Sequence, residues 1–239
     1  MIFEGALSVK AAIKGRKRVV EKVIIAQDKH SKDISYIKKL CAMNQIPVEL
    51  WDKAKINTIA AGKTHGGILA IAQERSYQPL ESMLKKPSFI CLLEGIEDPF
   101  NLGYILRSLY SAGCTGVLCG KRDWQNVENI ICKSSAGASE FIDICQSDDL
   151  AKDLAYLKAQ GVKCYAAYRN QAISYLEQDY RQDILIAIGG EMRGLSKDVL
   201  NAMDGYVYIP YANDFRNALN ASSAASVIAY EVLRQRSQM

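Results

Sequence analysis

The chain has 239 residues, 49% apolar and 23% charged, an ordinary balance for a soluble protein that buries one large core or two modest ones. No apolar run approaches the roughly 20 residues that cross a bilayer, so a membrane-spanning protein is excluded. Residues 1–20 lack the apolar core and cleavage site of a secretion signal, and secretion is not expected.

The seven cysteines include no Cys-x-x-Cys pair and lie mostly in apolar surroundings. An odd number of cysteines without metal-ligand spacing predicts reduced, buried thiols and therefore a cytoplasmic protein. With only two histidines, His30 and His65, no metal site is expected.

The positive charge is confined to the front third of the chain. Residues 1–76 hold 14 Lys/Arg and 7 Asp/Glu, whereas residues 77–239 hold 16 and 19. A basic run is usually a solvated face, but an excess of this size on a small domain attracts a phosphate backbone. We favour nucleic-acid contact through a cluster of basic residues: Lys14, Arg16, Lys17, Arg18 and Lys22.

Residues 1–76 predict a small α/β domain. Helices are expected at 5–13, 34–44 and 56–61, and strands at 19–26, 48–51 and 68–72. His65 precedes two glycines, where a histidine is more often a turn residue than a ligand. Residues 77–88 contain Pro79 and Pro87 and are expected to form a linker, with at most one helical turn.

Residues 89–239 predict a second, larger α/β domain. Strands are expected at 89–94, 117–119, 162–168, 184–188 and 206–209, and the clearest helices at 149–160 and 220–236. Another helix follows Pro99, with Asn101 as its cap, and its apolar stripe should pack on the sheet. Near-continuous apolar strands alternating with helices predict a parallel sheet covered on both faces.

The last fifty residues predict a site. Gly189-Gly190 ends one strand and leaves backbone groups uncovered for a ligand, and Pro210 ends the next strand. A polar loop then leads into a helix whose first turns, 221–226, carry only small side chains that permit close approach. Because ligands of open α/β sheets bind outside the strand ends, these segments are expected to meet at one place.

The motifs exclude several enzyme classes and indicate another. No Gly-x-Gly-x-x-Gly follows a strand, and neither a phosphate-binding lysine loop nor a Gly-x-Ser-x-Gly elbow occurs, which excludes nicotinamide, phosphoryl-transfer and common hydrolase chemistry. Four motifs instead occur in order and resemble those of the SpoU (TrmH-type) branch of the SPOUT RNA methyltransferases. They are Asp98-Pro99-x-Asn101-x-Gly103-x-x-x-Arg107, Lys133-x-Ser135-Ala136-Gly137-Ala138, Gly190-Glu191-x-x-Gly194-Leu195-Ser196, and Ile209-Pro210 with Leu219-Asn220-x-Ser222.

This resemblance covers residues 90–239 strongly and 1–76 loosely. It implies a SPOUT domain at 89–239 whose chain forms a trefoil knot, preceded by an RNA-binding domain at 1–76 that is similar in fold to a small ribosomal protein. It also implies a homodimer with its site near the subunit boundary, and S-adenosylmethionine held by Gly189, Ile209 and Leu219. Relatives with such a domain often carry a His-Gln-Gly turn before an apolar strand, and this chain has His65 in that place with Gly66 instead of the glutamine. The resemblance therefore adds His65 to the expected RNA-binding residues.

The implied reaction is methyl transfer to a ribose 2′-hydroxyl of RNA. The family's candidate for activating that hydroxyl matches Arg107, either as a base or, since a guanidinium stays charged, as a clamp for the target phosphate and developing alkoxide. Asn101 would orient Arg107 or the ribose, and Glu191 would balance charge or hold Arg107. Asn220 and Ser222 would line the pocket, and Asn220 is alternatively a plain helix cap.

The third motif departs from the family pattern. Tyr211 replaces a methionine, no glycine lies between Tyr211 and Leu219, the loop is one residue longer, and Ala218 replaces a serine. The favoured function remains a cytoplasmic rRNA 2′-O-methyltransferase, because a separate basic domain suits a large structured RNA. A tRNA 2′-O-methyltransferase and a non-catalytic RNA-binding or ribosome-assembly protein are the alternatives.

Overall fold

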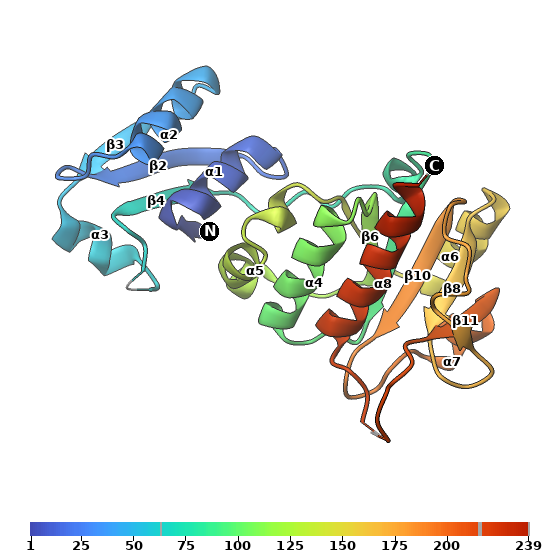
Figure 1. Cartoon of the computed structure of the whole chain (residues 1–239). Coiled ribbons are helices and arrows are strands. Elements are labelled where there is room, and N and C mark those ends of the chain that lie inside the picture. Colours follow the sequence, from blue (N-terminus) through green and yellow to red (C-terminus); the bar gives the residue numbers. More distant parts are fainter. Residues whose placement is uncertain (63, 215–216, 239) are drawn as a thin grey trace. The chain divides into compact units, whose positions relative to one another are not determined.

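A computed structural model describes residues 1–62, 64–214 and 217–238. The chain divides into two compact units (Figure 1). The first unit contains Met1–Ser76 together with Asp123–Phe141, and the second contains Tyr77–Arg122 and Ile142–Met239. The chain therefore passes between the units three times, and a segment from the middle of the sequence belongs to the front unit.

The first unit is a four-stranded sheet with helices on both faces. The strands, in spatial order, are β1 (Ile2–Glu4), β4 (Ile68–Ala72), β2 (Val20–Ala26) and β3 (Val48–Trp51). The strand β4 pairs antiparallel with both neighbours, and β2 pairs parallel with β3. The helices are α1 (Gly5–Gly15), α2 (Lys32–Met43), α3 (Lys53–Ile59) and α5 (Glu128–Ser134).

Alternating side chains of this sheet supply its two cores. Val23 and Ile25 of β2 lie in one cluster with residues of α1 and α2, whereas Ile24 lies in another with Ile56 of α3. The predicted helices and strands of residues 1–76 are all present, and half of their ends are shifted by one to three residues. The short strand β1 was not predicted, because three residues carry too little pattern.

Asp123–Phe141 packs against α1 in the first unit. Cys132 and Phe141 join the apolar cluster of α1 and α2. Gly137 has a positive φ of 85°, and a Cβ atom there would lie 2.7 Å from the Cβ of Ala11. A Cβ atom on Gly15 would lie 1.8 Å from the carbonyl oxygen of Glu140. The segment and α1 can therefore pack this closely only because glycines occupy both positions.

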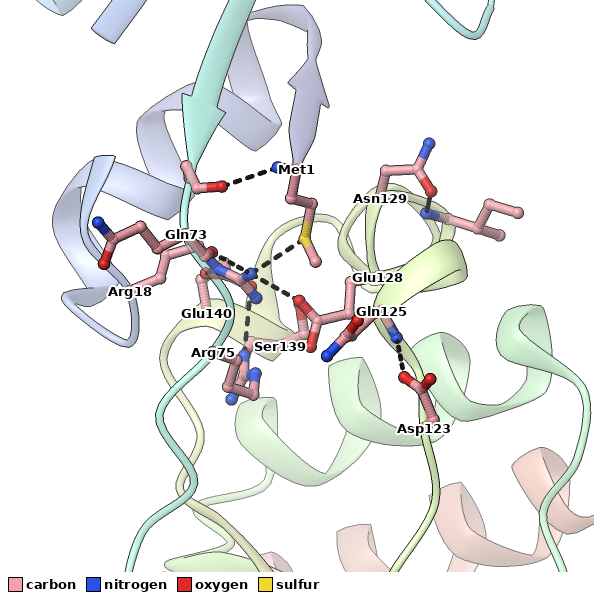
Figure 2. A network of polar contacts seen from close by, with 12 residues as sticks. Met1, Arg18, Gln73, Arg75, Asp123, Gln125, Glu128, Asn129, Ser139 and Glu140 are labelled. Atoms are coloured by element: carbon pink, nitrogen blue, oxygen red, sulfur yellow. Dashed lines mark hydrogen bonds and ion pairs between the residues drawn. The ribbon is translucent and has the colours of Figure 1, made fainter. Parts of the chain in front are cut away.

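A buried ionic network also holds the segment (Figure 2). Arg18 Nε donates to Glu140 Oε2 at 2.8 Å, and Arg18 Nη1 donates to Glu128 Oε2 at 2.6 Å. Arg75 Nη2 donates to Glu140 Oε1 at 3.2 Å and to the carbonyl oxygen of Ser139. Burial alone would lower the pKa of Arg18, but the two carboxylates outweigh it and raise that pKa.

The second unit is a seven-stranded sheet in which every pairing is parallel, as predicted. The strands, in spatial order, are β7 (Ile144–Ser147), β6 (Gly116–Gly120), β5 (Phe89–Glu94), β10 (Ile184–Gly189), β8 (Lys163–Ala167), β11 (Gly205–Tyr208) and β9 (Ile173–Ser174). The edge strand β7 was not predicted, because Gln146 and Ser147 interrupt its apolar run.

Helices cover both faces of this sheet. Helices α4 (Pro99–Ser111) and α8 (Ala221–Arg236) lie side by side on one face (Figure 1). The other face packs against α6 (Leu150–Ala159) and α7 (Lys197–Asn201), through Leu154 and Val199 among others. In residues 77–88, a 3₁₀ turn (Leu80–Met83) buries Leu80 and Met83 in that same core.

The start of α4 corrects one expectation. Asn101 is not the cap but the third residue of the helix. Asp98 is the cap, because its carboxylate accepts the backbone N–H groups of Phe100 and Asn101. Pro99 occupies the first helical position, where its missing N–H leaves no bond unmade.

Candidate functional site

The turn after β10 is built on glycines. Gly190 N donates to the carbonyl oxygen of Glu94 at 2.7 Å, so the loops after β5 and β10 touch backbone to backbone. A Cβ atom on Gly190 would lie 1.9 Å from the carbonyl oxygen of Gly95, and one on Gly189 would lie 2.5 Å from the carbonyl carbon of Gly194. No larger residue fits at either position without moving the backbone.

The same loop is held further along by a carboxylate and a cap. Ser196 N donates to Glu94 Oε2 at 2.8 Å, and Ser196 Oγ accepts from the backbone N–H of Val199 at the start of α7. Glu94 thus holds the second motif through its carbonyl oxygen at Gly190 and its side chain at Ser196. The loop after β10 is therefore fixed near its start by the backbone of Glu94 and near its end by the Glu94 carboxylate and the cap of α7.

A pocket of about 840 Å³ opens at the carboxyl ends of β8, β10 and β11. Its volume is typical of a site for a small organic ligand. The loop before α8 and the first turn of that helix complete the wall. Its lining includes Arg169, Gly189, Glu191, Ile209, Tyr211 and Leu219.

A smaller hollow of about 130 Å³ adjoins it and shares Gly190, Glu191 and Ala221 with the larger pocket. Asn101 at the start of α4 also lines this hollow. Asn101 Nδ2 donates to Glu191 Oε1 at 3.4 Å. The first and second motifs therefore meet beside the larger pocket, although they lie 90 residues apart in the sequence.

The structure brings most of the expected site residues together. All three residues expected to hold the cofactor (Gly189, Ile209 and Leu219) line the large pocket with Glu191 and Asn220. Asn220 also caps α8, because its side-chain oxygen accepts from Ser223 N at 2.8 Å, so both readings of this residue apply.

Two expected residues lie outside these linings. Ser222 Oγ donates to Asn220 Oδ1 at 3.1 Å and supports the cap. Arg107 is exposed on α4, and among the described residues it belongs to neither lining. In this chain the guanidinium is therefore not part of either pocket wall.

Sequence reasoning missed the residues that follow β8. Tyr168 and Arg169 line the large pocket, as do Arg193 and Lys197 of the second motif and α7. The apolar run ending at Ala167 was recognised as a strand, but strand order decides which loops share an edge. Only the pairing of β8 with β10 and β11 places Arg169 at this pocket.

The expected RNA-binding residues lie in different environments in the first unit. Lys14 and Arg16 are exposed, and Lys17 is half-buried. Lys22 Nζ, also half-buried, forms an ion pair with Glu49 at 2.9 Å.

Arg18 and His65 are buried, and both bond within the protein. The ring of His65 bonds through Nε2 to Asn57 Oδ1 at 3.0 Å, and its Nδ1 accepts from Gly67 N at 3.1 Å. These bonds favour a role in the turn for His65.

Three further features concern membrane-spanning helices, metal ligands and thiols. None of the helices in the described part of the chain combines the length and apolar character needed to cross a membrane. No group of three or more His, Cys, Asp or Glu among the described residues is arranged to hold a metal ion. All seven cysteines are free, and burial raises the pKa of the Cys132 and Cys164 thiols to about 12.

Comparison with known families shows the family to which the chain belongs. Residues 88–230 match the SpoU rRNA Methylase family, and residues 2–78 match the RNA 2'-O ribose methyltransferase substrate-binding domain. The chain belongs to the SpoU rRNA methylase family and is an RNA methyltransferase of that family.

Among curated relatives, a putative TrmH family tRNA/rRNA methyltransferase of Staphylococcus aureus is 32% identical over 223 residues, which are 91% of this chain and 89% of that protein. Its counterpart in Staphylococcus saprophyticus is 31% identical and covers 99% of this chain and 96% of that protein.

Solved structures share the SPOUT methyltransferase fold. The SpoU methyltransferase AviRb of Streptomyces viridochromogenes has a TM-score of 0.83 at 20% identity, covering all of this chain and 90% of that one. The AdoMet-bound rRNA methyltransferase of Sinorhizobium meliloti has a TM-score of 0.81 at 20% identity, covering 98% and 86%. The TrmH/SpoU tRNA modifying enzyme of A. aeolicus has a TM-score of 0.58 at 22% identity, covering 66% and 81%.

Proposed function

We propose that this chain transfers a methyl group from S-adenosylmethionine to a ribose 2′-hydroxyl of RNA, with rRNA favoured over tRNA. One observation carries the proposal. The three residues that match the family's cofactor positions line a single pocket of about 840 Å³ at the strand ends. The sequence separates them by up to 30 positions, from Gly189 to Leu219.

The pocket fits this cofactor. Gly189 and Gly190 line the pocket without side chains, and the loops after β5 and β10 can pack closely there because a Cβ atom at either glycine would meet their backbone. Apolar walls from Ile188, Ile209 and Leu219 suit an adenosine, and Glu191 offers a carboxylate to a cationic group. S-adenosylmethionine, when bound, supplies an electrophilic methyl group on a sulfonium.

The remaining catalytic parts come from the chain itself. A guanidinium offers a positive charge and several N–H donors in a fixed plane, so we assign Arg107 to holding the target phosphate and the developing alkoxide. The contact between Asn101 and Glu191 lies beside the cofactor pocket and would orient the ribose. Asn220 and Ser222 fix the start of α8, which forms one wall.

We further propose a homodimer formed through α4 and α8, with the C-terminal chain passing through a trefoil knot. Arg107 lies outside the pocket linings of its own protomer, so a second copy would complete the site. Exposed apolar side chains on both helices support this interface. They are Phe100, Tyr104, Tyr110, Tyr230 and Leu233, each at least 37% exposed.

The choice of rRNA rests on the first unit. The rRNA methyltransferase of S. meliloti matches 98% of this chain, whereas the tRNA modifying enzyme of A. aeolicus matches 66%. We assign RNA contact to exposed Lys14 and Arg16 with Lys17 and Lys22, in a cytoplasmic enzyme. Arg18 and His65 would support this surface from within, because their polar groups bond inside the unit.

The test measures transfer of labelled methyl groups to purified rRNA, ribosomal subunits and tRNA. Arg107→Ala should lower kcat at least about 100-fold with an unchanged Kd for S-adenosylmethionine. Arg181→Ala is the matched control, an exposed arginine of the same unit paired with Asp179. A dinucleotide that resists alkaline hydrolysis identifies 2′-O methylation. No transfer to any of these RNAs refutes the proposal.

A non-catalytic RNA-binding protein is the second candidate, and one feature favours it. Ala218 has no hydroxyl to offer the pocket, and Tyr211 occupies the start of the third-motif loop. Calorimetry separates the two candidates. A chain that binds rRNA but shows no heat of S-adenosylmethionine binding is the non-catalytic protein.

A further inference from the structure

The rim of the large pocket contains a hydrogen bond that joins the two ends of one loop. The backbone N–H of Leu219 donates to the Tyr211 hydroxyl at 2.7 Å. Tyr211 directly follows Pro210 at the end of β11, and Leu219 directly precedes the cap of α8. The neighbouring Ala218 has no side-chain oxygen that could accept a hydrogen bond. The Tyr211 hydroxyl, from the other end of the loop, is the acceptor for the backbone N–H of Leu219.

The guanidinium of Arg169, in the loop after β8, contacts the ring of the same tyrosine. The Arg169 guanidinium carbon lies 4.3 Å from the centre of the Tyr211 ring. A guanidinium at this distance over an aromatic face is attracted to it and limits the ring's movement. Arg169 comes from the loop after β8, the strand that pairs with both β10 and β11. The third-motif loop is thus tied to the sheet through a side chain.

Both contacts act on the pocket wall. Arg169, Tyr211 and Leu219 all line the large pocket, and Leu219 is adjacent to Asn220, which caps α8. Between β11 and α8 the chain has no helix or strand in its described residues. Ordering such a loop when a ligand binds costs conformational entropy, which a pre-formed loop avoids.

We propose that Tyr211 and Arg169 are a positioning pair that holds Leu219, at the wall of the cofactor pocket, in place before the cofactor arrives. The hydroxyl holds the backbone of Leu219, and the guanidinium holds the ring that carries the hydroxyl. The pair acts on binding of S-adenosylmethionine and leaves the methyl-transfer step unchanged. The inference rests on the proposed function, since it assigns these residues to that cofactor.

The test compares Tyr211→Phe and Arg169→Gln with the wild type by calorimetry with S-adenosylmethionine. Loss of the single hydrogen bond in Tyr211→Phe should raise Kd about three- to tenfold. Loss of the cation over the ring in Arg169→Gln should raise Kd about two- to fivefold. KM for S-adenosylmethionine should rise in parallel, while kcat stays within about twofold. Tyr36→Phe, which removes an exposed hydroxyl from α2, is the matched control.

A third variant tests whether Arg169 acts through the ring. In a Tyr211→Leu background, Arg169→Gln should have no further effect on Kd, because no ring remains for the guanidinium to hold. An effect that persists there would mean that Arg169 contacts the ligand directly, which overturns the positioning role.

The remaining outcomes separate this inference from the proposed function. If the wild type shows no binding, the proposed function fails. If the wild type binds and Tyr211→Phe binds equally well or more tightly, the positioning pair is refuted while the proposed function stands. An unchanged Tm in each variant shows that the loss lies in the loop and not in the fold.

Discussion

Neutralising Glu140 should strongly destabilise the protein. Its carboxylate is 1% exposed and accepts from Arg18, whose side chain is fully buried, and from Arg75, whose side chain is 4% exposed. The two arginines and the two glutamates of the network carry equal and opposite charge. Glu140→Gln leaves Arg18 paired with Glu128 and removes the carboxylate that pairs with buried Arg75.

The expected loss is about 3–5 kcal/mol, the usual cost of removing one partner from a buried ion pair. For a chain of this length each kcal/mol lowers Tm by roughly 2–4 °C, so Tm should fall by roughly 6–20 °C. Differential scanning calorimetry measures this directly. Asp148→Asn is the control, because it removes an ion pair with Lys121 whose side chains are 79% and 62% exposed, and exposed pairs contribute little.

A double variant tests the charge balance itself. Arg18→Gln alone leaves an excess of negative charge, but Arg18→Gln with Glu140→Gln leaves one buried arginine and one buried glutamate. The double variant should therefore lose less stability than the two single variants added together. Strict additivity, or a Tm for Glu140→Gln equal to that of Asp148→Asn, would refute the reasoning.

Three further predictions concern the site loop and the effect of pH. Gly190→Ala should abolish cofactor binding and lower Tm, since its Cβ atom would lie 1.9 Å from the Gly95 carbonyl oxygen; calorimetry and thermal melts test both. Burial of Glu4 would raise its pKa, but the Lys133 ammonium and two backbone amides lower it, so stability falls as pH drops through that lowered pKa; urea titrations between pH 6 and 3 should show this dependence weakened in Glu4→Gln. Burial raises the pKa of the Cys114 thiol to about 12, whereas an unfolded thiol ionises near pH 8.5. As pH rises above about 8.5 the unfolded chain loses this proton and is favoured, so the urea concentration at the unfolding midpoint should decrease. A midpoint that does not change up to pH 10 would contradict this.

The parts of the fold that the sequence predicted are those with a strong local pattern. The strand expected at 89–94 is Phe89–Glu94, because five consecutive residues there are buried. Asn101 was predicted to cap α4 because Asn is a favourable cap residue. Pro99 instead occupies the first helical position, which makes the preceding residue, Asp98, the cap. The cap residue depends on which peptide begins the helix, and that depends on the turn before it.

The parts that the sequence did not predict depend on distant pairings. Arg169 lies over Tyr211 only because β8 and β11 are neighbours. Arg18 was grouped with exposed basic residues, yet its carboxylate partners lie 110 and 122 residues further along the chain. Nothing in the local sequence distinguishes this arginine from exposed Arg16.

The segment Asp123–Phe141 explains why the buried arginines are tolerated. Its ends continue directly into β6 and β7 of the second unit, while its own Glu128 and Glu140 neutralise Arg18 and Arg75 of the first. Lys133 of the same segment pairs with buried Glu4 at 2.9 Å. The segment that contains the second of the four motifs therefore supplies partners for the ionic groups of residues 1–76. Residues 1–76 alone would contain both buried arginines without these carboxylates, so the first unit is complete only when the chain has returned to it.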